Sequence, residues 1–427
     1  MGNVCSLNRE PRQFISTASG DAEAVERLNQ LFADAVRCGA SDLHIESKED
    51  GNAYIRYRVG GTMRIIDEVP RHVATQMANK VRMKAKMPLS ERDCPLDGKI
   101  TLEVDGRLVD LRVSIVPTLG GESVVCRILD MTNRGFSIDD INMEPEVRRA
   151  IVHAASHTEG IVLATGPTGS GKTTTLFGLL NHLNSCERKI VTIEDPVEYR
   201  IPMACQIPIS QGTTFAKALR AVLRQDPDII LVGEIRDAET ARTAIQAAMT
   251  GHLVLSTLHA NDIPTTLIRL MDLALGNTDD TFVIEVTVKG IVNQRLVRRI
   301  CPHCHSERAP THQELLYLER HRNVWSGMFP EPKLYHGVGC QECHGTGYDG
   351  RMSIVEFLGI SSSLYPAIRS RNRMEILRYA RKYVPYYRTL NEVGLIEALR
   401  GKTTLAEVWR VSFNDMEAIE EAQEVIL

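Results

Sequence analysis

The most informative residues of this chain stand at positions 166–173: Gly166-Pro167-Thr168-Gly169-Ser170-Gly171-Lys172-Thr173. They fit the pattern G-x-x-x-x-G-K-[ST], in which glycines let backbone N–H groups turn inward around a polyphosphate. The pattern predicts that Lys172 reaches the terminal phosphates and that Thr173 offers its hydroxyl to Mg²⁺, with Thr174 also in the binding set. The alternative is a glycine-rich turn without a ligand.

The residues on both sides of this loop support a nucleotide site. The apolar run 161–164 predicts a buried strand that enters the loop, and residues 174–180 predict a helix that leaves it. The N-terminus of such a helix attracts phosphate groups. We therefore expect ATP to bind at this strand–helix junction.

Composition places the chain among ordinary globular proteins. Its 427 residues are enough for more than one domain, and 43% hydrophobic and 24% charged residues are unremarkable values. A formal net charge of −4 gives no global nucleic-acid footprint. No apolar run approaches the ~18 residues that span a bilayer, and the N-terminus lacks a secretory core. We expect a cytoplasmic protein without a nucleic-acid partner.

Changes in the hydrophobic pattern predict five regions. Between residues 132 and 290, apolar strands at 161–164, 190–193, 229–232 and 253–257 alternate with helices, which is typical of an α/β fold: a parallel sheet with helices on both faces. The predicted regions are a flexible tail (1–20), an N-terminal α+β domain (21–131), the α/β core (132–290), a cysteine-rich subdomain (291–360) and a helical C-terminal region (361–427).

Carboxylates follow two of the predicted core strands. Glu234 comes directly after the strand 229–232 and Gly233, so it is the acid available to hold the water shell of Mg²⁺ or to orient an attacking water. Glu194 and Glu198 come at the end of the strand before it, at the edge that faces the ligand in open parallel sheets. One of them is predicted to polarise the attacking water, and the spacing does not say which.

Histidines and arginines give weaker signals. His252 and His259 flank the strand 253–257 and are candidates to contact the γ-phosphate, although a single histidine is as often structural. Arg112 and Arg127 lie on predicted strands of the N-terminal domain. Either arginine is able to stabilise transition-state charge, or it is an ordinary surface residue.

Four cysteines form two C-x-x-C pairs separated by thirty-five residues: Cys301 with Cys304, and Cys340 with Cys343. Four thiolates from two such turns suit tetrahedral Zn²⁺, and a closed four-cysteine site is structural rather than catalytic. Further along, a basic stretch from Arg369 to Lys382 contains two tyrosines. It indicates a solvated helix face, with contact to anionic lipid or a partner as the alternative.

Taken in order, several motifs resemble the secretion ATPases of type II secretion and type IV pilus systems. The resemblance covers about residues 21–412. It rests on the following runs: Ala40–Glu46, the loop 166–173, Glu194–Tyr199, Asp228–Asp237, His252–Asp262, Asn293–Arg298, and Gly401–Thr404 with Glu407 and Arg410.

This resemblance implies a RecA-like P-loop NTPase core, a PAS-like N-terminal domain and a homo-hexamer. It implies that hydrolysis of ATP drives assembly of a pilus or pseudopilus through an inner-membrane platform protein, with the ATPase peripheral to that membrane. It also implies that Glu194 and Glu198 belong to the catalytic glutamate region, and that Glu234 is the Walker B glutamate. By the same resemblance His252 and His259 form the histidine box, and Arg112 and Arg127 contact nucleotide.

Within the family, paired cysteines are typical of assembly motors and are generally lacking in retraction motors. Assembly motors usually carry a further N-terminal domain, whereas only about twenty residues precede the N-terminal pattern here. The remaining alternatives are a retraction motor, a DNA-translocating ATPase of a conjugation system, and a catalytically inactive scaffold ring.

Overall fold

The computed structural model describes residues 20–130, 136–209, 212–276, 280–343 and 345–412. The chain divides into two compact units, Met1–Arg134 and Gly135–Leu427. Each unit has a hydrophobic core of its own. The predicted tail and the end of the predicted C-terminal region lie outside the described residues.

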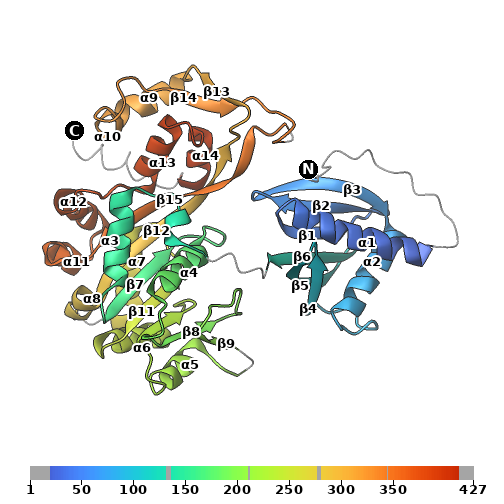
Figure 1. Ribbon diagram of the computed structural model, residues 1–427, viewed down its shortest axis with the longest axis horizontal. Coiled ribbons are helices and arrows are strands. Elements are labelled where there is room, and N and C mark those ends of the chain that lie inside the picture. Colours follow the sequence, from blue (N-terminus) through green and yellow to red (C-terminus); the bar gives the residue numbers. More distant parts are fainter. Residues whose placement is uncertain (1–19, 131–135, 210–211, 277–279, 344, 413–427) are drawn as a thin grey trace. The chain divides into compact units, whose positions relative to one another are not determined.

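The first unit is an antiparallel sheet with two helices. Its strand order is β3-β2-β1-β6-β5-β4, and α1 and α2 pack against each other and against β1 (Figure 1). The elements are α1 (Gly20–Arg37), β1 (Ala40–Ser47), β2 (Asn52–Val59), β3 (Thr62–Pro70), α2 (Arg71–Lys84), β4 (Leu96–Val104), β5 (Arg107–Thr118) and β6 (Gly121–Asp130).

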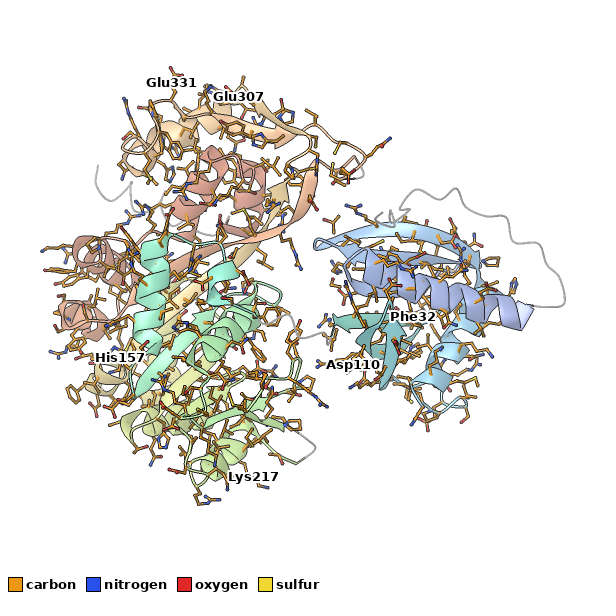
Figure 2. All side chains as sticks on the ribbon, in the orientation of Figure 1. Phe32, Asp110, His157, Lys217, Glu307 and Glu331 are labelled. Atoms are coloured by element: carbon orange, nitrogen blue, oxygen red, sulfur yellow. The ribbon has the colours of Figure 1, made fainter. Side chains whose placement is uncertain are left out.

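Alternation along the strands explains how this first sheet packs. Leu43 and Ile45 of β1 point into the core with Phe32 of α1, which Figure 2 labels, while His44 between them faces the other side of the sheet. Gly60 and Gly61 at the β2–β3 turn and Gly106 at the β4–β5 turn adopt positive φ, as tight hairpin turns require. The pattern analysis contains no counterpart of α2, which begins directly after Pro70.

The second unit is built on a seven-stranded sheet of order β15-β12-β7-β11-β10-β8-β9. All neighbouring pairs are parallel except β12 with β15. Four strands coincide with the predicted ones: β7 (Gly160–Thr165), β8 (Ile190–Glu194), β10 (Ile229–Val232) and β11 (Leu253–Leu258). The α/β architecture with a largely parallel sheet is confirmed.

Helices cover both faces of this sheet. Ile161 and Leu163 of β7 belong to one core cluster and Val162 and Ala164 to another, so both faces of the strand are buried. Figure 1 shows the helices on the two sides of the strands. The helices are α3 (Pro145–Ala155), α4 (Lys172–Leu183), α5 (Phe215–Val222), α6 (Ala238–Met249), α7 (Ile263–Leu275) and α8 (Phe282–Thr287), with a 3-10 turn at Ile138–Asp140.

The sheet extends beyond the predicted core boundary at residue 290. The long strands β12 (Val288–Ile300) and β15 (Tyr348–Gly359) pair with each other, and β12 also pairs with β7. Between them the chain forms β13 (His305–Arg308), α9 (His312–Arg320), α10 (Arg322–Trp325) and β14 (Leu334–Gly337). The cysteine-rich segment is therefore joined to the seven-stranded sheet by two of the sheet's own strands (Figure 1).

Helices follow the last strand, in the region where the sequence pattern predicts them. They are α11 (Tyr365–Arg369), α12 (Arg373–Tyr383), α13 (Leu390–Leu399) and α14 (Leu405–Ser412), with a 3-10 turn at Ser362–Leu364. The remaining strand, β9 (Cys205–Pro208), comes earlier in the chain and forms the edge of the sheet next to β8. Thr389 and Glu392 form a capping box that fixes the start of α13.

Candidate nucleotide site and metal centre

The loop 166–173 connects the end of β7 to the first turn of α4. Gly166 and Gly171 have φ angles of +138° and +93°, which a side chain rarely tolerates. Pro167, Thr168 and Gly169 are exposed at the tip, whereas Ser170 and Lys172 are buried. Thr173 and Thr174 follow at the start of the helix, where free N–H groups point outward. The strand, the loop and the helix thus follow one another as the sequence predicts.

The ammonium group of Lys172 folds back onto its own loop. It donates hydrogen bonds to the carbonyl oxygens of Gly166 at 2.8 Å and Pro167 at 3.0 Å. Burial and then the nearby charge of Arg295 lower the pKa of Lys172, Glu234 opposes them, and the result is a pKa of about 8. A phosphate group would supply a better partner for this cation than two carbonyl oxygens.

A small pocket of about 100 Å³ lies beside the first turn of α4. Carboxyl ends of parallel strands meet at the same edge of the sheet, and this edge brings the predicted acidic residues together with Thr173. The residues lining the pocket are Thr173, Leu176, Phe177, Glu194, Asp195, Pro196, Glu198, Phe215, Leu231, Gly233, Glu234 and Thr257.

Glu194 and Glu198 differ in their surroundings. Glu194 is buried, and its carboxylate accepts hydrogen bonds from Thr192 at 2.6 Å and Gln206 at 3.0 Å. Burial raises its pKa, while those two hydrogen bonds act in the opposite direction. Glu198 is half-buried and lines the same pocket. Glu198 is thus the more accessible of the two to an attacking water, and Glu194 is the more constrained.

Glu234 lies next to one of the two predicted histidines. Its carboxylate is 3.5 Å from Nε2 of His259 and 2.5 Å from Arg236. His252 is not brought to this site. It precedes β11, and its carbonyl accepts a hydrogen bond from the N–H of Gly160 at the start of β7. His252 therefore lies at the amino ends of these parallel strands, whereas the phosphate loop lies at their carboxyl ends. The direction of β11 separates the two histidines.

A larger hollow of about 550 Å³ borders the other side of the loop. Gly171, Thr174 and Thr175 contribute to it from the loop and α4, and Arg148, Arg299, Arg351 and Lys402 contribute positive charge. The pattern analysis quoted Lys402 only as part of the run Gly401–Thr404 and did not single out the three arginines, because they come from separate parts of the second unit. The hollow is wide enough for the nucleoside part of a nucleotide.

Arg112 and Arg127 lie opposite each other on β5 and β6. They belong to the first unit, on the face of its sheet that the core does not use. Lys99 of β4 faces Arg112 in the same row, and Asp42 of β1 faces Arg127 on the other side. Nε of Arg127 donates to Asp42 at 3.1 Å, while 60% of the Arg127 side chain stays exposed.

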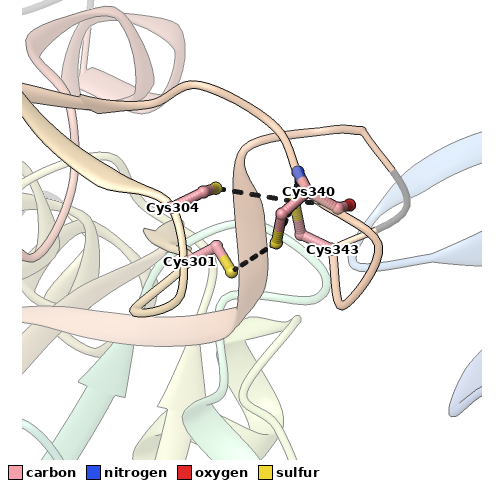
Figure 3. A group of neighbouring side chains, drawn as sticks. All are labelled: Cys301, Cys304, Cys340 and Cys343. Atoms are coloured by element: carbon pink, nitrogen blue, oxygen red, sulfur yellow. Dashed lines mark hydrogen bonds between the residues drawn. The ribbon is translucent and has the colours of Figure 1, made fainter.

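The four predicted metal ligands meet at one point in the second unit. Figure 3 shows Cys301 and Cys304 on one turn, facing Cys340 and Cys343 on another. Sulfur–sulfur distances of 3.7 and 3.8 Å join the two turns. A tetrahedron with Zn–S bonds of about 2.3 Å has edges of about 3.8 Å, so the four sulfur atoms fit Zn²⁺.

Backbone groups around these cysteines also suit a metal centre. The N–H groups of Cys340 and Gly347 each donate to Sγ of Cys343 at 3.2 Å. Burial of Cys343 opposes ionisation, but these donors, together with hydrogen bonds to the thiols of Cys340 and Cys304, lower its pKa to about 6. A thiolate at neutral pH is the form that binds zinc.

The basic stretch from Arg369 to Lys382 is engaged in ion pairs. Arg369 binds Glu285, Arg373 binds Asp262, and Arg381 binds Glu392, all within 3.0 Å. These partners lie within the second unit, so much of the positive charge is neutralised internally. The stretch therefore fits a structural helix face better than a lipid-binding surface.

A sheet whose strand ends hold a phosphate-binding loop, a hydroxyl at the helix start and several carboxylates defines a P-loop ATPase. The family model of the Type II/IV secretion system proteins matches residues 17–410 of this chain. The chain therefore belongs to the Type II/IV secretion system protein family, and it is an ATP-hydrolysing P-loop enzyme.

Two relatives illustrate the match. Type II secretion system protein E of Aeromonas hydrophila is 38% identical over 401 residues, which are 93% of this chain and 77% of that protein. Type II secretion system ATPase E of Vibrio cholerae is 38% identical over 396 residues, 92% of this chain and 76% of that protein.

Solved structures agree with the fold. The pilus retraction motor PilT with bound ADP superposes with a TM-score of 0.61 at 25% identity, covering 90% of this chain and 96% of that one. The ATPase DotB of Legionella pneumophila gives a TM-score of 0.65 at 21% identity, covering 96% of this chain and 98% of that one. The second similarity supports the architecture alone.

Proposed function

We propose that this chain is the motor of a type II secretion or type IV pilus machine. A homo-hexamer couples ATP hydrolysis to assembly of a pseudopilus or pilus, at the cytoplasmic face of the inner membrane and against a platform protein there. Family membership and the relatives named type II secretion system protein E support this proposal. Among the described residues, no helix is both long and apolar enough to cross a bilayer.

The observation that carries the proposal is the pocket shared by Thr173, Glu194, Glu198 and Glu234 beside the phosphate loop. Lys172 holds the β- and γ-phosphates, while Thr173 and Glu234 hold Mg²⁺. The bound ion supplies positive charge to the phosphates. Glu198 or Glu194 orients the attacking water, with His259 at the edge of the pocket.

Arg112 and Arg127 stabilise the transition-state charge from the first unit. The cross-strand row Lys99, Arg112 and Arg127 supports this role. Like charges that face each other directly across two strands destabilise a sheet. Asp110 pairs with Lys99 and Asp42 pairs with Arg127, so a nucleotide phosphate placed against this row would replace or join these two carboxylates.

The four cysteines hold one structural Zn²⁺ per chain. This centre also favours an assembly motor over a retraction motor, because the family resemblance associates paired cysteines with assembly. The similarity to PilT keeps retraction as the second candidate. The two functions differ in the phenotype of cells that lack the protein.

The test uses the bacterium that carries this chain, with the gene deleted and then restored as wild type or as Lys172→Ala. The variant should fold, lack ATP turnover and fail to restore secretion or filament assembly, because the phosphates lose their fixed cation. Lys217→Ala, an exposed lysine of α5, is the matched control and should restore both. Excess filaments in the deletion strain would establish retraction instead, and full turnover by Lys172→Ala would refute the site.

A further inference from the structure

Three consecutive polar residues of β12, Asn293, Gln294 and Arg295, are buried next to the phosphate loop. Their exposed fractions are 0%, 1% and 7%. Buried amides and guanidinium groups in the middle of a strand need hydrogen-bond partners. Alternation along the strand directs Gln294 to one side and its two neighbours to the other.

The amide of Gln294 joins the phosphate loop to the helix after it. Its Nε2 donates to the carbonyl of Ser170 at 2.9 Å, and Thr175 Oγ1 donates to its Oε1 at 2.7 Å. Thr175 is fully buried and Ser170 is 3% exposed. One side chain from a neighbouring strand thus holds both ends of the segment that contains Gly171 and Lys172.

The two strained glycines of the loop fit closely against the same residue. A Cβ atom at Gly171 would lie 2.8 Å from Nε2 of Gln294, and one at Gly166 would lie 2.6 Å from its carbonyl oxygen. Both approaches are closer than a Cβ atom tolerates. The loop therefore packs directly against Gln294: a side chain at Gly166 would clash with the Gln294 backbone, and one at Gly171 would displace the Gln294 amide.

The neighbours of Gln294 hold the loop that carries His259. Asn293 Nδ2 and Arg295 Nη2 each donate to the carbonyl of Asn261 at 3.0 Å. Asn293 also donates to Glu356 at 2.9 Å. The same strand segment therefore contacts both loops that border the proposed phosphate site.

We propose that Gln294 is a positioning residue that keeps the phosphate loop in its nucleotide-binding shape. This role rests on the proposed nucleotide site. The ammonium group of Lys172 is bonded to the loop carbonyls of Gly166 and Pro167, and it must leave them to reach a phosphate. Gln294 supplies hydrogen bonds that do not change during that exchange, so the loop keeps its curvature while the lysine moves.

The experiment compares the full-length chain with Gln294→Met, which keeps the length of the side chain and removes both hydrogen bonds. Binding of the slowly hydrolysed analogue ATPγS is measured at equilibrium, alongside kcat with ATP and the Tm without nucleotide. Two net hydrogen bonds are lost, so we expect binding about tenfold weaker, with a smaller change in kcat. Hydrogen exchange of amides 170–175 should become faster.

Thr175→Val removes one of the two hydrogen bonds and should weaken binding less. In the double variant with Gln294→Met, binding should be no weaker than with Gln294→Met alone, because the two residues share that bond. Thr287→Val is the matched control. Its buried hydroxyl donates to Val283 at the opposite edge of the sheet, so it should lower Tm comparably to Thr175→Val and leave ATPγS binding unchanged.

Two outcomes separate this role from the proposed function. A wild-type chain that does not bind ATPγS would overturn the nucleotide site and the role of Gln294 together. A wild-type chain that binds, with unchanged affinity in Gln294→Met and in Thr175→Val, would overturn the role of Gln294 alone. A lower Tm of Gln294→Met with unchanged affinity for ATPγS would also overturn the role of Gln294, because the residue would then only support the fold.

Discussion

Glu234 and Glu198 line one pocket with Thr173, and charge-removing substitutions distinguish their roles. Glu234→Gln should still bind ATP and hydrolyse it slowly, because the amide keeps the shape and loses the negative charge that Mg²⁺ and water need. Glu198→Gln should behave in the same way if Glu198 is the general base. Equilibrium nucleotide binding and single-turnover hydrolysis measure the two effects separately.

The matched control for these variants is Glu239→Gln, which removes an exposed carboxylate from the start of α6, outside the pocket. Its turnover should equal that of the wild type. If Glu198→Gln is silent while Glu194→Gln is slow, the base is Glu194. Full activity in all three pocket variants would contradict the site.

Glu407 of α14 gives a pH dependence of stability. Its burial opposes ionisation, but hydrogen bonds from Arg410 and Arg298 prevail and lower its pKa from 4.5 to about 2. A carboxylate whose pKa is lowered by folding stabilises the folded state. This stabilisation is complete above the pKa of the unfolded state and disappears as the pH falls toward the pKa of the folded state. As the pH is lowered from about 4.5 to about 2, the Tm of the wild type should therefore fall more steeply than the Tm of Glu407→Gln.

Thermal unfolding of both proteins at matched pH values measures this difference. Any loss of metal in acid affects both proteins and cancels in the comparison. The variant should be the less stable of the two at pH 7, where the ionised carboxylate is fully effective. Parallel Tm curves for the two proteins would remove Glu407 as the cause.

The sequence predicted the residues of the phosphate loop and the acidic residues near it because each follows a recognisable strand. His252 and His259 show what such local patterns cannot predict. Both flank the same apolar run, and only the direction of β11 within the sheet separates them. Gln294 lies 37 residues beyond the end of the last predicted core strand at residue 257, so no local pattern connects it with Ser170.

At the scale of elements, the metal centre is the clearest test. Freshly purified, reduced protein should contain about one zinc ion per chain, because the four thiolates match its geometry. Cys340→Ser should lose the metal and loosen β13, β14 and α9, since a structural zinc contributes folding energy directly. Metal analysis and hydrogen exchange measure the two effects.

Cys186→Ser is the matched control, because Cys186 is exposed and outside the metal cluster. It should keep the zinc and the wild-type exchange pattern. The main sheet should keep its protection from hydrogen exchange in Cys340→Ser. The residues of β12 that pair with β7 lie between Val288 and Asn293, in the half of the strand away from the cysteines. Zinc-free wild-type protein would remove the metal centre.

Elements held by long-range pairing were the ones that the pattern analysis missed. The apolar residues of β12 and β15 are interrupted by Arg295, Arg298 and Arg351, so these strands do not resemble buried core strands. They join the sheet because each pairs along most of its length with the other. Similarly, α2 is rich in basic residues and is fixed by the buried ion pair between Arg82 and Glu122.

At the scale of the whole molecule, the proposed hexamer predicts that turnover depends on assembly. Arg127→Ala should lower kcat strongly, since an arginine that acts at the transition state contributes ~10³-fold or more, while nucleotide binding changes less. Wild-type specific activity should fall when the protein is diluted below its assembly range. Turnover against protein concentration, together with sedimentation, measures both effects.

Arg107→Ala removes the same charge from the exposed start of β5 and serves as the control, with wild-type kcat expected. A wild-type activity that stays constant down to the monomer would contradict the ring mechanism. An unchanged kcat in Arg127→Ala would remove this arginine from the site.

The long strand β12 also limits how the length of this chain is able to change during evolution. Gln294 contacts the phosphate loop and Cys301 belongs to the metal cluster, and a single stretch of backbone connects them. Adding or deleting one residue there would turn every following side chain to the opposite face of the sheet. Relatives should therefore vary in length between α9 and β14 and keep the spacing from Gln294 to Cys301 unchanged.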